Sequence, residues 1–146
     1  MAVQRMDNVL IVVEDLDEVV AFFTELGLEE EGRGPVEGRW VERVIGIEGV
    51  RQEVAMLRTP DGHGRIELAS FRTPAAIAPE PRNAPANTLG IRRVMFAVDD
   101  IDDVVARLLA RGGELVGEVV RYEDVYRLCY VRGPEGIVVG LAESIG

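Results

Sequence analysis

Residues 12–29, VVEDLDEVVAFFTELGLE, decide the fold, because the chain repeats them 85 positions later as residues 97–114, AVDDIDDVVARLLARGGE. Eight of the eighteen aligned positions carry the same residue. Each copy runs from an apolar strand through an acidic cap into a helix with apolar periodicity. The period is too long and the copies are too few for a solenoid. The repeat therefore indicates a duplicated small module.

The first copy belongs to a module predicted as β-α-β-β-β. Asp15 is a good helix N-cap with Glu18 three residues on, and Gly27 supplies the stop. A short amphipathic helix is predicted within residues 35–47, a segment with no counterpart in the second copy. The strands of this module, which spans residues 4–71, are predicted at residues 4–13, 28–33, 50–58 and 65–71.

The second module repeats this order after a proline-rich linker. Residues 72–87 hold four of the seven prolines, so they predict an extended, semi-rigid linker. Asp100 is expected to cap a helix that ends near Arg111. The strands of this module, which spans residues 88–143, are predicted at residues 89–98, 114–119, 125–132 and 136–143.

Composition limits the classes of partner. The chain has 146 residues, about one domain, with 47% apolar and 29% charged residues and a formal charge of −10. This charge argues against nucleic acid or an anionic membrane as a partner. No apolar run is long enough to span a membrane, and the N-terminus does not resemble a signal peptide. The single cysteine, Cys129, excludes an intramolecular disulfide, and we expect a cytoplasmic protein.

The repeated V-x-D-[LI]-D-x-V-V-A motif, followed by a glycine and by a late strand entered through P-[DE]-G, resembles the vicinal oxygen chelate superfamily. This group includes glyoxalases, bleomycin-resistance proteins, epimerases and ring-cleaving dioxygenases. The resemblance covers residues 4–71 and 88–143. It implies a single α+β domain of two βαβββ modules, which form curled mixed sheets around an open cleft. It also implies a homodimer, and the proline-rich linker would let modules pair either within one chain or between two chains.

The resemblance also implies where a metal ion would bind. Metal-dependent members usually carry a histidine early in the first strand of each module and a glutamate in the last strand of each module. The equivalent positions here are Asn8 and Arg93 in the first strands, with Glu67 and Gly140 in the last strands. Only Glu67 fits a carboxylate ligand, and an arginine repels a divalent ion. We therefore predict no metal site and no cofactor, with a divalent ion near Glu67 as the alternative.

Arg93, which stands where metal-dependent members usually have a histidine, is the most informative of these differences. It predicts either a structural ion pair with Glu67 or an arginine that binds a carboxylate, phosphate or enolate oxygen, with Glu67 as partner or general base. Asn8 would add an amide donor and acceptor. Arg92 is expected to point to the opposite face of the strand.

Aromatic residues supply further candidates. Tyr126 and Tyr130 share one strand face and form either a stacking wall for a ligand or half-buried sheet residues. Trp40, the only tryptophan, belongs either to a lid or to the core. Cys129 is expected to pack inward, and His63 is expected in a surface turn, with a functional role as the alternative.

Three functions follow as hypotheses. The first is a protein of the glyoxalase and bleomycin-resistance type that binds a small organic molecule without metal. The second is an enzyme of the same superfamily: a metal-dependent lyase or dioxygenase, or a metal-free isomerase with Glu67 as base. The third is a structural partner protein whose cleft is filled by its own side chains.

Overall fold

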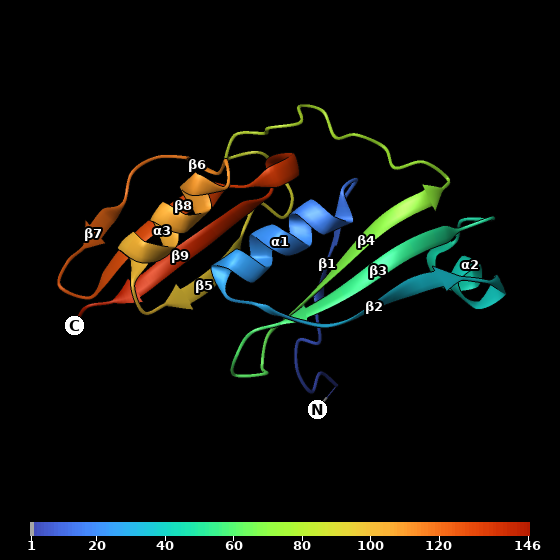
Figure 1. Ribbon diagram of the computed structural model, residues 1–146, viewed down its shortest axis with the longest axis horizontal. Helices are drawn as coiled ribbons and strands as arrows, with labels where there is room; N and C mark the ends of the chain where they lie inside the picture. Colours follow the sequence, from blue (N-terminus) through green and yellow to red (C-terminus); the bar gives the residue numbers. More distant parts are fainter. Residues whose placement is uncertain (1) are drawn as a thin grey trace. The chain divides into compact units, whose positions relative to one another are not determined.

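The protein, described for residues 2–146 by a computed structural model, divides into two compact units. The first unit ends at Ala78 and the second runs from Pro79 to Gly146, so the boundary falls inside the predicted linker. Each unit is a mixed sheet with a helix packed on one face (Figure 1). The α+β class and the two sheets are as predicted. Neither sheet closes on itself or curls strongly, so the expected curling of the sheets is wrong.

The first unit follows the predicted β-α-β-β-β order with the extra helix α2. Its sheet has the order β1-β4-β3-β2, in which β1 runs parallel to β4 and the other pairs are antiparallel. The elements are β1 (Val9–Val12), α1 (Leu16–Leu26), β2 (Glu29–Glu37), α2 (Arg39–Ile45), β3 (Arg51–Arg58) and β4 (Arg65–Thr73).

The second unit has the same plan with one more short strand. Its sheet has the order β5-β9-β8-β6, with β5 parallel to β9, and β7 also pairs with β8. The elements are β5 (Val94–Val98), α3 (Ile101–Ala110), β6 (Glu114–Leu115), β7 (Val120–Tyr122), β8 (Tyr126–Arg132), the 3-10 turn η1 (Pro134–Gly136) and β9 (Val138–Ser144).

Both long helices begin at the predicted caps. The carboxylate of Asp15 accepts a hydrogen bond from the Glu18 N–H at 3.1 Å, and Asp100 accepts one from the Asp103 N–H at the same distance. Each cap satisfies a backbone donor that the first helical turn leaves unpaired. Gly27 ends α1 at a φ of 127°, which a residue with a side chain rarely adopts. The repeated acidic motif is therefore a repeated helix start.

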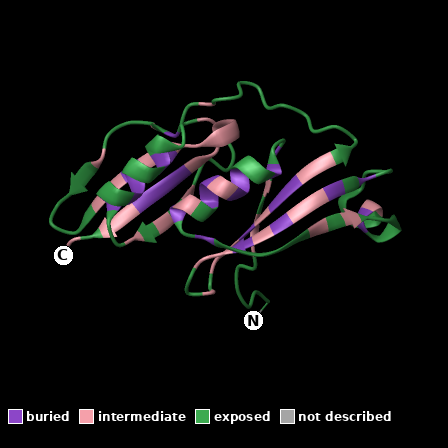
Figure 2. Ribbon diagram, in the orientation of Figure 1, coloured by how far each residue is buried: buried purple, intermediate pink, exposed green. Residues whose placement is uncertain are grey.

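Each unit has its own apolar core between the helix and the sheet (Figure 2). In the first unit, Leu57 and Leu68 are 0% exposed beneath α1. In the second, Leu108 on α3 meets the inward face of β8 and β9, where Val131 and Leu141 are also 0% exposed. Burial of a leucine of this kind contributes about 1.5–3 kcal/mol.

Strand register confirms the internal repeat. Val9 pairs with Ile66 and Leu10 with Glu67, while Val94 pairs with Val139 and Met95 with Gly140. The first strands are thus related by 85 positions and the last strands by 73. The register shows that the two modules are equivalent residue by residue across their central strands.

Several predicted strand limits are wrong. The strands expected at residues 4–13 and 89–98 contain only Val9–Val12 and Val94–Val98, since their leading apolar residues are largely exposed outside the sheets. The strand expected at residues 28–33 continues to Glu37. It passes through Pro35, which an edge strand tolerates because one side of its backbone is unpaired. The strand expected at residues 114–119 ends at Leu115.

Candidate functional site

The central strand of each sheet carries the position that most distinguishes the two modules. Glu67 on β4 lies between Leu10 on β1 and Met56 on β3. Gly140 on β9 lies between Met95 on β5 and Tyr130 on β8. Glu67 and Gly140 therefore occupy equivalent places, as the sequence alignment predicts.

The space above Gly140 is filled by neighbouring side chains. A Cβ atom built on Gly140 would collide with the Met95 sulfur. It would also stand 3.4 Å from Arg93 Cδ and 3.4 Å from Tyr130 Cε1. Three side chains from two flanking segments thus converge over a residue that has none. Sequence reasoning identified Arg93 and Tyr130 separately but missed Met95. Met95 is the residue equivalent to Leu10 under the 85-residue shift.

Arg93 and Tyr130 contact each other directly. Arg93 Nε donates a hydrogen bond of 2.5 Å to the Tyr130 hydroxyl, and the guanidinium carbon lies 5.3 Å from the centre of the Tyr130 ring. Both contacts hold the cation on the open face of the sheet, opposite α3. The two residues lie 37 positions apart in the sequence and meet because β5 and β8 flank β9.

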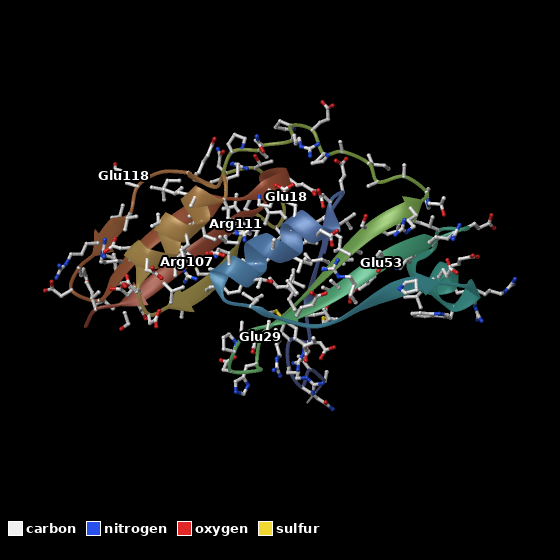
Figure 3. The ribbon with its side chains drawn as sticks, viewed as in Figure 1. Glu18, Glu29, Glu53, Arg107, Arg111 and Glu118 are labelled. Carbon is white, nitrogen blue, oxygen red and sulfur yellow. The ribbon has the colours of Figure 1, made fainter. Side chains whose placement is uncertain are left out.

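The Arg93 charge differs from that of three other arginines in its unit, which pair with aspartates. Arg121 and Arg127 pair with aspartates at 2.8 Å. Arg107, labelled on α3 in Figure 3, pairs with Asp103 at 3.1 Å. Within residues 79–146, Arg93 has only the neutral phenol of Tyr130 as a hydrogen-bonding partner. Within this unit its two terminal NH₂ groups have no partner and can act as charged donors. Pairing of Arg93 with Glu67, which lies in the first unit, stays a prediction.

The tyrosines lie on one sheet face, as their spacing predicts. Tyr130 and Leu128 are half-buried, and Tyr126 is 42% exposed and pairs across the strands with Tyr122. The intervening Cys129 points to the core and is 4% exposed. Burial raises the pKa of the Cys129 thiol, so it is the neutral form that packs there. The aromatic face and the buried thiol are thus on opposite sides of β8.

The candidates of the first unit are more dispersed. Asn8 precedes β1 and is half-buried, and Glu67 is half-buried on the face of the sheet opposite α1. Within residues 2–78, Glu67 has no hydrogen-bonding or ionic partner. Trp40 begins α2 and is 63% exposed, so the expectation that it packs in the core is wrong. A lid role for Trp40 stays a prediction.

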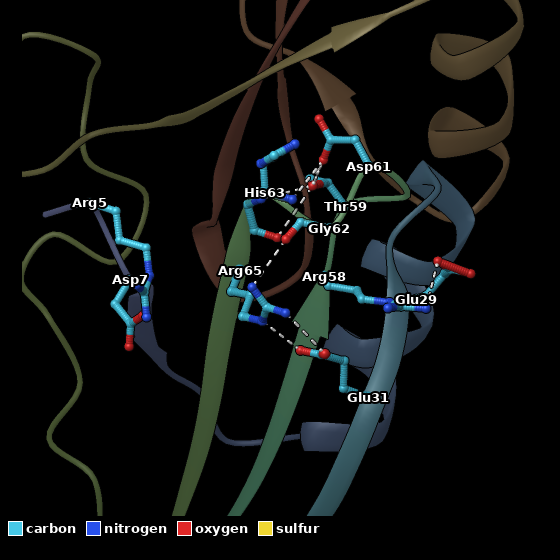
Figure 4. Close-up of polar contacts among 11 residues, drawn as sticks. Arg5, Asp7, Glu29, Glu31, Arg58, Thr59, Asp61, Gly62, His63 and Arg65 are labelled. Carbon is cyan, nitrogen blue, oxygen red and sulfur yellow. Dashed lines mark hydrogen bonds and ion pairs between the residues drawn. The ribbon is translucent and has the colours of Figure 1, made fainter.

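His63 lies in the turn between β3 and β4, as predicted (Figure 4). Its backbone N–H donates to the Asp61 carboxylate at 2.9 Å, and the Thr59 hydroxyl donates to the same oxygen at 2.5 Å. The Thr59 hydrogen bond is the main reason that the pKa of Asp61 lies below its ordinary value. Next to the turn, Arg65 pairs with Glu31 at 2.9 Å. The turn is a self-contained network, and the His63 side chain is exposed.

The start of α1 borders a surface hollow of about 560 Å³ that sequence reasoning missed. Arg33, which lines the hollow, pairs with Asp17 and with Glu30. No sequence signal linked these residues, because they come together only through the packing of α1 on the sheet. The hollow is lined by Glu14, Asp15, Leu16, Asp17, Arg33, Glu53, Ser70 and Arg72.

Comparisons with known proteins place this architecture. The crystal structure of a glyoxalase family protein from Bacillus cereus is 58% identical and superposes with a TM-score of 0.95, covering 100% of this chain and 99% of that chain. A glyoxylase/bleomycin resistance protein/dioxygenase domain from Frankia sp. EAN1pec shares the fold, with 17% identity, a TM-score of 0.68 and coverage of 98% and 99%. Among residues 2–146, no helix is long and apolar enough to cross a membrane.

Curated proteins and a family description agree with the structural matches. The Mycobacterium bovis protein CFP32 is 34% identical over 87 residues, which are 58% of this chain. The aligned region is 33% of that relative, so the chain spans about a third of its length. The family described as Glyoxalase/Bleomycin resistance protein/Dioxygenase superfamily matches residues 5–141, nearly the whole chain. The chain therefore belongs to the glyoxalase/bleomycin resistance protein/dioxygenase superfamily.

Proposed function

We propose that the chain binds a small organic molecule without a metal ion. The observation that carries this proposal is the packing of Arg93, Met95 and Tyr130 over Gly140. In metal-dependent members, the resemblance places ligands at the positions of Arg93 and Gly140. Here one of these residues is a permanent cation and the other has no side chain.

The remaining positions do not supply a divalent site by themselves. Asn8 offers one amide oxygen and Glu67 one carboxylate, whereas protein zinc sites use three or four side-chain ligands. Within each unit of residues 2–146, no group of three or more histidine, cysteine, aspartate or glutamate side chains could hold a metal ion. The donor set therefore does not fit the ion, and no chemical step is assigned to one.

Polar and aromatic groups support ligand binding in place of the metal. Arg93 and Tyr130 offer hydrogen-bond donors on an exposed face, and Tyr126 extends that face. Binding sites for small molecules combine apolar and aromatic walls with a few placed polar groups. Asn8, Glu67 and Trp40 remain candidate ligand-binding residues of the first unit.

A ligand screen by thermal shift tests the proposal. Wild type, Arg93→Ala and the neighbouring control Arg92→Ala are screened against the same library of small acids, amines and neutral aromatics. We expect hits that stabilise wild type and Arg92→Ala but not Arg93→Ala, because only Arg93 lies beside Tyr130. If every hit stabilises all three proteins equally, Arg93 is not in the site.

An enzyme that uses Glu67 is the second candidate function. The observation in its favour is that Glu67 is half-buried and has no partner within residues 2–78, so no ion pair within that unit occupies its carboxylate. The metal-dependent version predicts one divalent ion per chain after expression in supplemented medium, and loss of that ion in Glu67→Gln. Elemental analysis measures both. A stoichiometric ion that Glu67→Gln loses would replace the metal-free proposal.

A further inference from the structure

A row of side chains lies along one face of β8 in the second unit. Arg93 and Tyr130 stand at one end, and Leu128 and Tyr126 continue the same face of β8. Residues two apart on a strand share a face, so the row from Tyr130 to Tyr126 extends roughly 13 Å at about 3.3 Å per residue. One end of the row is charged and the rest is apolar or aromatic.

The charged end is suited to a single negative charge. Arg93 has no carboxylate partner within residues 79–146, in a chain whose formal charge is −10. A dianion such as phosphate would meet one neutralising cation against an acidic background, whereas a carboxylate would be balanced. The two terminal NH₂ groups of a guanidinium also match the two oxygens of a carboxylate.

Tyr130 completes the charged end. Its hydroxyl oxygen accepts from Arg93 Nε at 2.5 Å, so the hydroxyl proton is available to donate to a ligand oxygen. The same hydrogen bond and the ring contact at 5.3 Å fix the orientation of the guanidinium. Tyr130 is therefore both a positioning residue for Arg93 and a ligand donor.

We propose that the second unit binds a small aromatic monocarboxylate, with its carboxylate on Arg93 and Tyr130 and its ring along Leu128 and Tyr126. This inference rests on the proposed metal-free binding function and adds the class of ligand. The aromatic body follows from the exposed face of Tyr126, which is 42% exposed and pairs with Tyr122, itself 55% exposed. Stacking on such rings contributes about 0.5–1.5 kcal/mol beyond the buried area.

Isothermal titration with naphthalene-2-carboxylate and the neutral naphthalene-2-carboxamide tests the charged end. We expect wild type to bind the acid at least about tenfold more tightly than the amide, since a hydrogen bond between charged groups is stronger than a neutral one. Arg93→Gln should reduce the affinity for the acid to that for the amide. Arg92→Gln, which makes the same charge change one residue earlier, should leave the ratio unchanged.

Two further variants separate the anchor from the apolar row. Tyr130→Phe should lower the affinity for the acid about tenfold, because one charge-assisted hydrogen bond is lost while the ring contact remains. Tyr126→Ala should lower the affinities for the acid and for the amide by the same factor, because it removes only stacking surface. Arg93→Lys keeps the charge but loses the planar fork, so it should retain part of the preference for the acid. Thermal unfolding of each variant checks that it is folded.

Equal affinities of wild type for acid and amide would overturn the inference, and so would equal losses in Arg92→Gln and Arg93→Gln. Failure of both compounds to bind at millimolar concentration would also overturn it. If the thermal-shift screen then yields ligands that need Arg93 but carry no carboxylate, the metal-free binding function stands and the ligand class is wrong. Elemental analysis that finds a stoichiometric ion overturns the binding function itself.

Discussion

The two units share a backbone plan but differ at one row across their sheets. In the first, Leu10, Glu67 and Met56 lie side by side, and in the second the equivalent residues are Met95, Gly140 and Tyr130. Where the first unit has the carboxylate of Glu67, the second has a glycine. The side chains of Arg93, Met95 and Tyr130 fill the space above that glycine. The difference shows that a duplicated scaffold can change its chemistry at one register position while the surrounding strand pairing stays the same.

The ion pairs at the helix starts also differ between the two units. Asp17 and Asp102 hold equivalent places on α1 and α3, yet Asp17 pairs with Arg33 from β2 and Asp102 pairs with Arg127 from β8. The strand position equivalent to Arg127 in the first unit is Glu53. Each module thus reaches a similar ion pair from a different strand.

The largest expected effect tests whether the two cores are equally important. Leu68 and Leu141 are equivalent and 0% exposed, so Leu68→Ala and Leu141→Ala should each lower the free energy of unfolding by about 2–5 kcal/mol. Urea denaturation followed by circular dichroism measures both losses. A loss below about 1 kcal/mol in one variant would show that the units do not depend equally on their cores.

The next effect tests the packing over Gly140. Gly140→Ala should cost at most about 1.5 kcal/mol, because the new methyl group forces the flexible and partly exposed Met95 side chain out of its rotamer. Gly117→Ala is the matched control, since its new methyl group would have no neighbour within 4 Å, and its effect should be about zero or slightly stabilising.

A double variant sharpens this result. Gly140→Ala with Met95→Ala removes the atom that the methyl group meets, so its loss should be smaller than the sum of the two single losses. Additive losses would show that Met95 does not restrict the position. The same urea titrations supply all four free energies.

A smaller effect compares the two helix caps. Asp15→Ala and Asp100→Ala should each cost about 1 kcal/mol, because each removes the acceptor for a backbone N–H of the first turn. Asp15→Asn and Asp100→Asn retain an oxygen acceptor and should be nearly neutral. Equal losses for alanine and asparagine would show that charge, rather than capping, stabilises the helix start.

The smallest effect concerns the ion pair between Asp102 and Arg127. The Arg127 hydrogen bond lowers the pKa of Asp102 below its unfolded value, which is about 3.9. A lowered folded pKa gives stability that is present above the unfolded pKa and is lost as the pH falls through the folded pKa. Asp102→Asn should therefore lower the urea midpoint slightly at pH 7 and leave it unchanged at pH 2.

Salt provides the control for that experiment. Both side chains are partly exposed, so 1 M NaCl should reduce the pH 7 difference between wild type and Asp102→Asn. A difference that persists at pH 2 or in high salt would have a cause other than the ion pair.

Much of the fold is readable from the sequence because its signals are local. Asp15 and Asp100 are caps defined by residues three positions away, and the 59–62 turn depends on proline and glycine within one short segment. Strand limits were less accurate. Whether Leu89 or Ile91 joins a sheet depends on a partner strand, and both are more than 80% exposed.

The candidate site was only partly readable. Arg93 and Tyr130 could be named from the repeat and from strand alternation, but their contact requires the register of both β5 and β8 against β9. The filled space over Gly140 depends on three side chains that the sequence does not bring together. Contacts of this kind come from packing rather than from residue spacing.

The burial of Cys129 makes the second unit separately observable. The chain has one thiol, on the face of β8 that packs against the core. It is 4% exposed, and burial raises its pKa. A thiol reagent therefore reacts at a rate set by transient opening of that unit, since the closed protein shields the sulfur. Labelling kinetics, with no engineered cysteine, would report how often β8 separates from α3 and how far a bound ligand slows that opening.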